Sequence, residues 1–109
     1  MATLLLKKSY QLSNLKEVNF NDLWGSRGVF TTMRIVGKPP KLILLKPHLE
    51  NLIKSTKKYG IRKNNLKNII KDLINKNTIY KGPDNLFRIA LNKKLISVSI
   101  RKRPKQIGR

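Results

Sequence analysis

The stretch 28–60 constrains the fold most, because its pattern changes from strand to turn to helix within one short segment. Residues 30–36 alternate between two faces and are rich in β-branched and aromatic types, which predicts a strand. The turn-forming residues 37–40 follow, and the apolar run 42–45 predicts the returning strand of a hairpin. From Pro47 onward, apolar residues recur at helical spacing with lysines on the other side, so the hairpin leads into an amphipathic helix that stops at Gly60.

The remaining elements are weaker but follow the same rules. Residues 64–77 place apolar side chains at positions i, i+3, i+4 and i+7, which predicts a second helix with its lysines exposed. Residues 87–91 and 95–100 predict a β-hairpin around a polar turn. The compact apolar run 3–6 predicts a first strand, and the mixed polar segment 9–21 predicts a loop with at most one turn of structure.

These elements predict an α+β, two-layer domain over residues 1–101, in which two helices pack on a small, mostly antiparallel sheet. The basic residues 102–109 lack an apolar period and are expected to form a linker-like tail. A chain of 109 residues is long enough for one such domain at most. Trp24, in the loop before the first motif strand, is expected to be a core or interface anchor.

Charge is the most unusual feature of the composition. The chain has 25 Lys+Arg against 5 Asp+Glu, a formal net charge of +20, which favours phosphate-rich partners such as nucleic acid. The alternative is a bias in residue usage, because Lys, Asn and Ile are abundant along the whole chain. No basic run interleaves with stacking aromatics as single-strand binders usually require, so the sequence favours the bias.

Several function classes are excluded by what the chain lacks. It has no cysteine, which removes disulfides, thiolate metal sites and cysteine nucleophiles, and fits a cytoplasmic location. With a single histidine as well, a metal site built by the protein is not expected. No apolar segment approaches the roughly 18 residues that a membrane helix needs, so no membrane partner is expected.

Two motifs give the chain a family resemblance. The first is Gly-Val-Phe-Thr-Thr-Met-Arg over residues 28–34, and the second is His-Leu-x-x-Leu-x-x-Ser over residues 48–55. Because these motifs follow one another in this order, the chain resembles the N-terminal domain of the class IV aminotransferases. These pyridoxal-phosphate enzymes include branched-chain and D-amino acid aminotransferases and aminodeoxychorismate lyase, and the Phe-Thr-Thr-x-Arg variant is most similar to the lyase. The likeness extends more weakly to 86–91 and covers most of 20–101. It implies pyridoxal phosphate as cofactor, an amino acid or aminodeoxychorismate as substrate, and a homodimer.

Three residues match substrate-pocket positions of the resembling family. Phe30 would supply an apolar wall, and Arg34 a charged or structural contact, on the strand that faces the cleft. Arg88 matches a strand arginine that approaches the acidic group of the substrate in some aminotransferases, a role that suits its planar donor fork. Each has a plainer alternative: Phe30 as ordinary core, Arg34 as a turn cap, and Arg88 as one more exposed cation.

The cofactor site departs from the family. The family arginine that grips the cofactor phosphate in His-Leu-x-Arg-Leu is replaced here by Asn51, a neutral amide. We hypothesise that Lys54, on the same helical face, partly substitutes for it, the alternative being decay of the site. His48 is expected to be a structural residue at the helix start.

The family's Schiff-base lysine lies in a second, larger domain, and no lysine here has the matching context. The resemblance therefore implies no catalytic residue in this chain and no turnover by it alone. A missing C-terminal catalytic domain or a separate chain would complete the enzyme. Two other interpretations stay open: a small basic nucleic-acid-binding protein, and a non-catalytic remnant that acts by association.

Overall fold

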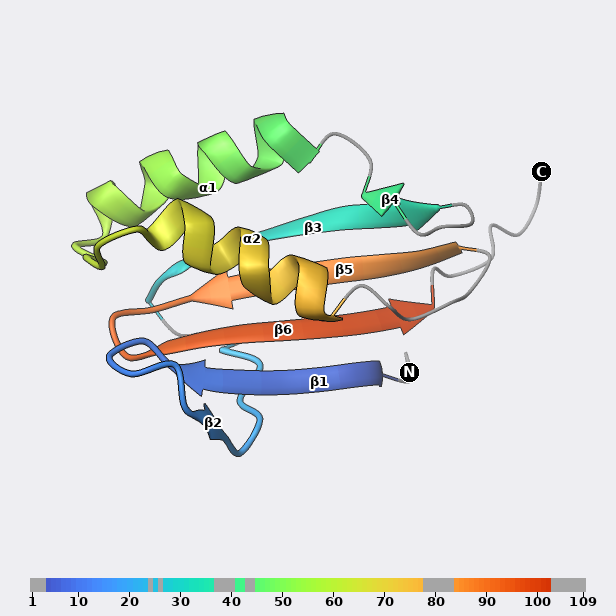
Figure 1. Ribbon diagram of the computed structural model, residues 1–109, viewed down its shortest axis with the longest axis horizontal. Helices are drawn as coiled ribbons and strands as arrows, with labels where there is room; N and C mark the ends of the chain where they lie inside the picture. Colours follow the sequence, from blue (N-terminus) through green and yellow to red (C-terminus); the bar gives the residue numbers. More distant parts are fainter. Residues whose placement is uncertain are drawn as a thin grey trace.

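In the computed structural model, the described residues are 4–23, 25, 27–36, 41–42, 45–77 and 84–102. Six strands and two helices follow one another along them (Figure 1). They are β1 (Leu4–Gln11), β2 (Glu17–Val18), β3 (Val29–Val36), β4 (Lys41–Leu42), α1 (Leu45–Lys58), α2 (Leu66–Asn77), β5 (Asp84–Leu91) and β6 (Leu95–Lys102).

The strands form one sheet in the order β2-β1-β6-β5-β3-β4, and every neighbouring pair is antiparallel. Both helices lie on the same side of this sheet, as Figure 1 shows. The predicted α+β two-layer architecture is therefore confirmed. The sheet has one face covered by helices and another, here called the helix-free face, on which α1 and α2 do not pack.

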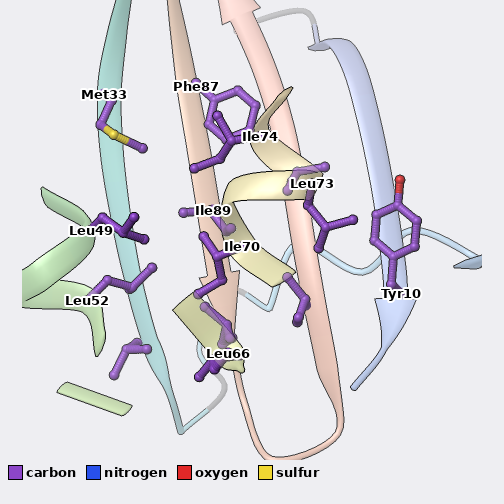
Figure 2. Packing of buried hydrophobic residues seen from close by; sticks show 14 of the residues in the cluster. Tyr10, Met33, Leu49, Leu52, Leu66, Ile70, Leu73, Ile74, Phe87 and Ile89 are labelled. Carbon is purple, nitrogen blue, oxygen red and sulfur yellow. The ribbon is translucent and has the colours of Figure 1, made fainter. Parts of the chain in front are cut away.

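The core lies between the helices and the sheet. Alternate residues of the central strands point toward the helices, and Phe87, Ile89 and Val98 are completely buried there. Ile70 of α2 and Leu49 of α1 pack against them (Figure 2). Fully burying each such side chain contributes about 1.5–3 kcal/mol, so this layer holds the sheet rigid and fixes what its other face presents.

Helix α1 ends where the sequence predicts. Gly60 has a φ of +67°, a conformation that glycine adopts without the steric cost of a side chain. The Gly60 N–H donates to the Lys57 carbonyl at 3.3 Å, and the Ile61 N–H donates to the Thr56 carbonyl at 3.0 Å. This pair of hydrogen bonds is a Schellman motif, which satisfies the last helical carbonyls.

The first strand is longer than predicted. Residues 9–11, expected to be loop, continue β1, and β2 lies within the same expected loop. Ser9 and Tyr10 pair with Ser97 and Ile96 of β6, so pairing with a distant strand overrides the polar local sequence.

Other element boundaries also differ from the prediction. Leu45 begins α1 instead of ending a strand, and the described part of β4 is only Lys41–Leu42. Helix α2 begins at Leu66 and not at residue 64, because Asn65 has a left-handed φ of 59° that a helix cannot include. β6 includes Lys102, the first residue of the predicted tail. Trp24 and the turn 37–40 lie outside the described residues.

Candidate functional site

The helix-free face gathers the side chains that alternate with the core residues. Strand register places Thr32, Arg88, Ser99 and Lys7 in one row across four strands, since each is directly opposite the next. A second row contains Arg34, Leu86 and Arg101. Among the side chains that the structure describes, the cations of these two rows are Lys7, Arg34, Arg88 and Arg101.

A loop crosses part of this face and is held there by buried serines. The Ser9 and Ser97 hydroxyl oxygens lie 2.6 Å apart, and Ser97 donates to the Asn21 carbonyl. The Asn21 N–H in turn donates to the Ser9 hydroxyl at 2.9 Å. These contacts fix the segment that leads to Asp22 and Leu23 above the sheet.

Phe30 and Arg88 meet beside this loop. The Arg88 guanidinium carbon lies 5.0 Å from the centroid of the Phe30 ring, within the range of a cation–π contact. Arg88 Nη1 donates to the Asp22 carbonyl at 2.7 Å, which orients the guanidinium. Phe30 is 59% exposed, so the alternative that it is an ordinary core residue is wrong.

A hollow of about 370 Å³ opens at this pair, and we call it the Phe30 hollow. It is lined by Leu23, Gly25, Gly28, Val29, Phe30, Arg88, Ala90 and Leu91. Arg34 lies on the same face, exposed and opposite Leu86, but it does not line the hollow. The structure thus brings two of the three predicted substrate-pocket residues into one hollow, with the third further along β3.

The surroundings of the Phe30 hollow disfavour the positive charge of Arg88. Burial lowers the pKa of Arg88, with Asp22 opposing the shift and Arg101 adding to it. Arginine nevertheless stays protonated at neutral pH, because its ordinary pKa is far above that range. A partly buried arginine with a second cation nearby favours binding of a carboxylate, which accepts charge-assisted hydrogen bonds from the guanidinium.

Asn51 and Lys54 lie elsewhere. Both are exposed on α1 and line a different hollow of about 350 Å³, with Pro47, Glu50, Ile53 and Lys67. Because α1 packs on the opposite side of the sheet, the structure does not bring these residues to the Phe30 hollow. The predicted contact of Lys54 with a cofactor phosphate stays a prediction.

The described residues do not fit pyridoxal phosphate as a resident cofactor. A Schiff-base lysine needs an amine whose charge is disfavoured, usually by burial, and none of the lysines whose side chains the structure describes is buried. The hollow at Asn51 adds the carboxylate of Glu50 where a phosphate would need only donors.

The described residues contain no group of three or more His, Asp or Glu side chains able to hold a metal ion. None of their helices has the length and apolar character needed to span a membrane.

A third hollow, of about 550 Å³, is strongly basic, and we call it the Tyr59 hollow. The spacing of residues along the sequence did not predict it. It is lined by Arg27, Lys58, Tyr59, Gly60, Asn92, Lys93 and Lys94. These residues come from three segments far apart in the chain, so no local pattern connects them.

No family model matches the chain, and neither a curated protein nor a solved structure matches it.

Proposed function

We propose that this chain is the N-terminal α/β part of a class IV aminotransferase or aminodeoxychorismate lyase, acting in the cytoplasm as a homodimer. Its helix-free face forms one wall of the substrate pocket. Pyridoxal phosphate and the Schiff-base lysine are supplied by a C-terminal catalytic domain or by a separate chain. The chain performs no turnover alone.

The observation that carries this proposal is the pairing of Phe30 with Arg88. Both belong to segments that resemble the family, and they meet at a hollow although they lie far apart in sequence. An exposed ring beside an oriented guanidinium suits a ligand with an apolar body and a carboxylate.

Each residue has a definite role in the proposed pocket. Arg88 binds the substrate carboxylate, while its hydrogen bond to the Asp22 carbonyl sets the plane of the guanidinium. Phe30 supplies apolar contact and excludes water from the wall. Arg34, on the same face of β3, supplies a charged or structural contact in this proposal.

The proposal is tested by mapping a carboxylate ligand on the isotope-labelled chain by NMR. Titration with L-glutamate or 2-oxoglutarate is expected to shift the amide signals of Phe30 and Arg88 and to leave those of Asn51 and Lys54 unchanged. Arg88→Gln removes the charge and should abolish the shifts. The matched control is Lys71→Gln, which removes one exposed charge from α2 and should change nothing. Equal loss in both variants would mean that only net charge attracts the ligand.

Two further measurements concern the proposed catalytic domain. We expect the purified chain with added pyridoxal phosphate to show no transamination or lyase activity. We also expect the gene region beyond the codon for Arg109, or a separate gene, to encode a second α/β domain with a strand-borne lysine. Absence of such a domain from the genome would end the catalytic assignment.

A further inference from the structure

The Tyr59 hollow has a defined place in the fold. Its lining residues belong to one end of the molecule, where β5 turns into β6 and where α1 ends. Figure 1 shows these two segments at the same end of the fold. Lys58, Tyr59 and Gly60 come from the end of α1, Asn92, Lys93 and Lys94 from the turn, and Arg27 from the loop before β3.

The charge of this hollow is of one sign. Arg27, Lys58, Lys93 and Lys94 line it, and no acidic side chain among the described residues does. Lys58 also lies in the last turn of α1, where a cation compensates the helix dipole. Arg27, Lys93 and Lys94 have no such role, so their convergence creates a positive potential that a phosphate-bearing partner would relieve.

The turn that carries two of these cations is held in place. Asn92 Oδ1 accepts hydrogen bonds from the Lys94 and Leu95 N–H groups, each at 2.8 Å. A Cβ atom added at Gly60 would lie 3.4 Å from Lys93 Cε, so the Lys93 side chain crosses the end of α1. The fold therefore fixes the positions of Lys93 and Lys94.

Tyr59 adds an aromatic surface among the cations. It is 42% exposed, and Phe30 is the other large hydrophobic side chain exposed among the described residues. The Schellman motif at Gly60 fixes the backbone on which Tyr59 stands. An exposed ring flanked by cations is the arrangement on which bases of single strands stack while their phosphates contact the cations.

We propose that the Tyr59 hollow binds single-stranded nucleic acid, with phosphates on Lys58, Lys93, Lys94 and Arg27 and a base stacked on Tyr59. The linear sequence separates basic and aromatic residues, but the fold interleaves them here. This site is separate from the Phe30 hollow and does not depend on the proposed enzyme function.

The test measures binding of the full chain to a fluorescein-labelled single-stranded RNA of about 12 nucleotides, by anisotropy at several salt concentrations. Lys93→Gln with Lys94→Gln removes two phosphate contacts and should reduce the slope of log K against log salt by about 1.4. The matched control is Lys71→Gln with Lys76→Gln, which removes two exposed charges from α2 and should leave the slope unchanged. Equal slopes for the two double variants would overturn the proposal.

Stacking is tested separately at Tyr59. Tyr59→Ala should weaken RNA binding about tenfold, whereas Tyr59→Phe keeps the ring and should bind like the native chain. Inorganic polyphosphate offers the same charge without bases and should not distinguish Tyr59→Ala from the native chain. If Tyr59→Ala binds RNA as tightly as Tyr59→Phe, the hollow is no site for single strands. Circular dichroism of each variant checks that the fold is retained.

Discussion

The imidazole Nδ1 of His48 lies 2.8 Å from the Thr31 hydroxyl oxygen, so the first turn of α1 is tied to the middle of β3. The two residues belong to the two motif segments that carry the family resemblance. Both are half-buried, and the hydrogen bond lies on the side of β3 opposite to Phe30. The contact gives His48 the structural role expected of it and fixes α1 against the strand that lines the Phe30 hollow.

Removing this hydrogen bond should weaken the domain modestly. We expect Thr31→Val and His48→Ala each to lower the free energy of unfolding, because a hydrogen bond contributes about 1 kcal/mol net. A double-mutant cycle measured by urea unfolding should give a coupling energy of roughly 1 kcal/mol. Thr32→Val, on the helix-free face, is the control, and its effect should add to that of His48→Ala within about 0.5 kcal/mol. Equal coupling in both cycles would contradict the assignment.

Gly28 marks the entry of β3, and its lack of a side chain is required there. A Cβ atom at this position would lie 2.1 Å from the Leu91 carbonyl oxygen, which is backbone of the paired strand β5 and cannot move aside. We expect Gly28→Ala to lower the free energy of unfolding by about 3 kcal/mol or more, since the strand pair must separate. Thermal and urea unfolding measure this loss.

Gly25 provides the comparison for Gly28. Its φ of +80° strains any other residue, yet no atom of the other described residues lies within 4 Å of an added Cβ. Gly25→Ala should therefore cost only about 1 kcal/mol, from backbone conformation alone. Losses of similar size at both positions would show that the approach of Gly28 to Leu91 is not the dominant cause.

The buried serine pair should control the loop over the helix-free face. Ser97→Ala removes the hydroxyl that donates to the Asn21 carbonyl and contacts Ser9, leaving buried groups with fewer partners. We expect a loss of about 1–3 kcal/mol in the free energy of unfolding. Hydrogen exchange at the Asn21 amide should accelerate, because its acceptor Ser9 loses the contact with the Ser97 hydroxyl and keeps only the longer hydrogen bond to the Asn21 carbonyl. Ser13→Ala, at an exposed side chain, should leave that exchange rate unchanged.

Local patterns predicted the elements whose apolar residues recur at a regular period. In β6, the apolar Ile96, Val98 and Ile100 alternate with serines as the sequence indicates, although Ser97 and Ser99 are buried as well. Helix α2 buries most of its predicted apolar stripe, with Ile69 half-buried. The extension of β1 could not be predicted from local sequence, because the polar Ser9 is buried by contacts with Ser97 on a distant strand and with Asn21.

For the sites too, local sequence predicted single residues but not the contacts between segments far apart in the chain. Phe30 and Arg88 were predicted through the motifs, and their meeting follows from the register that sets Thr32 opposite Arg88 and Phe30 opposite Ala90. The Tyr59 hollow could not be predicted, because the spacing of residues along the chain does not indicate that the end of α1 lies beside the β5–β6 turn.

Arg88 should affect stability without any dependence on pH in the ordinary range. Burial lowers its pKa in the folded chain, and Arg101 adds to the shift while Asp22 opposes it. The unfolded chain therefore holds this proton more tightly, and stability rises with pH only between the lowered pKa of folded Arg88 and the ordinary arginine pKa, far above neutral pH. Below that window Arg88 is charged in both states. The effect of Arg88→Met on the free energy of unfolding should thus agree within about 0.5 kcal/mol at about pH 5 and about pH 9. A difference that increases toward pH 9 would mean that folded Arg88 loses its proton there, and a neutral Arg88 would not serve as a carboxylate-binding wall.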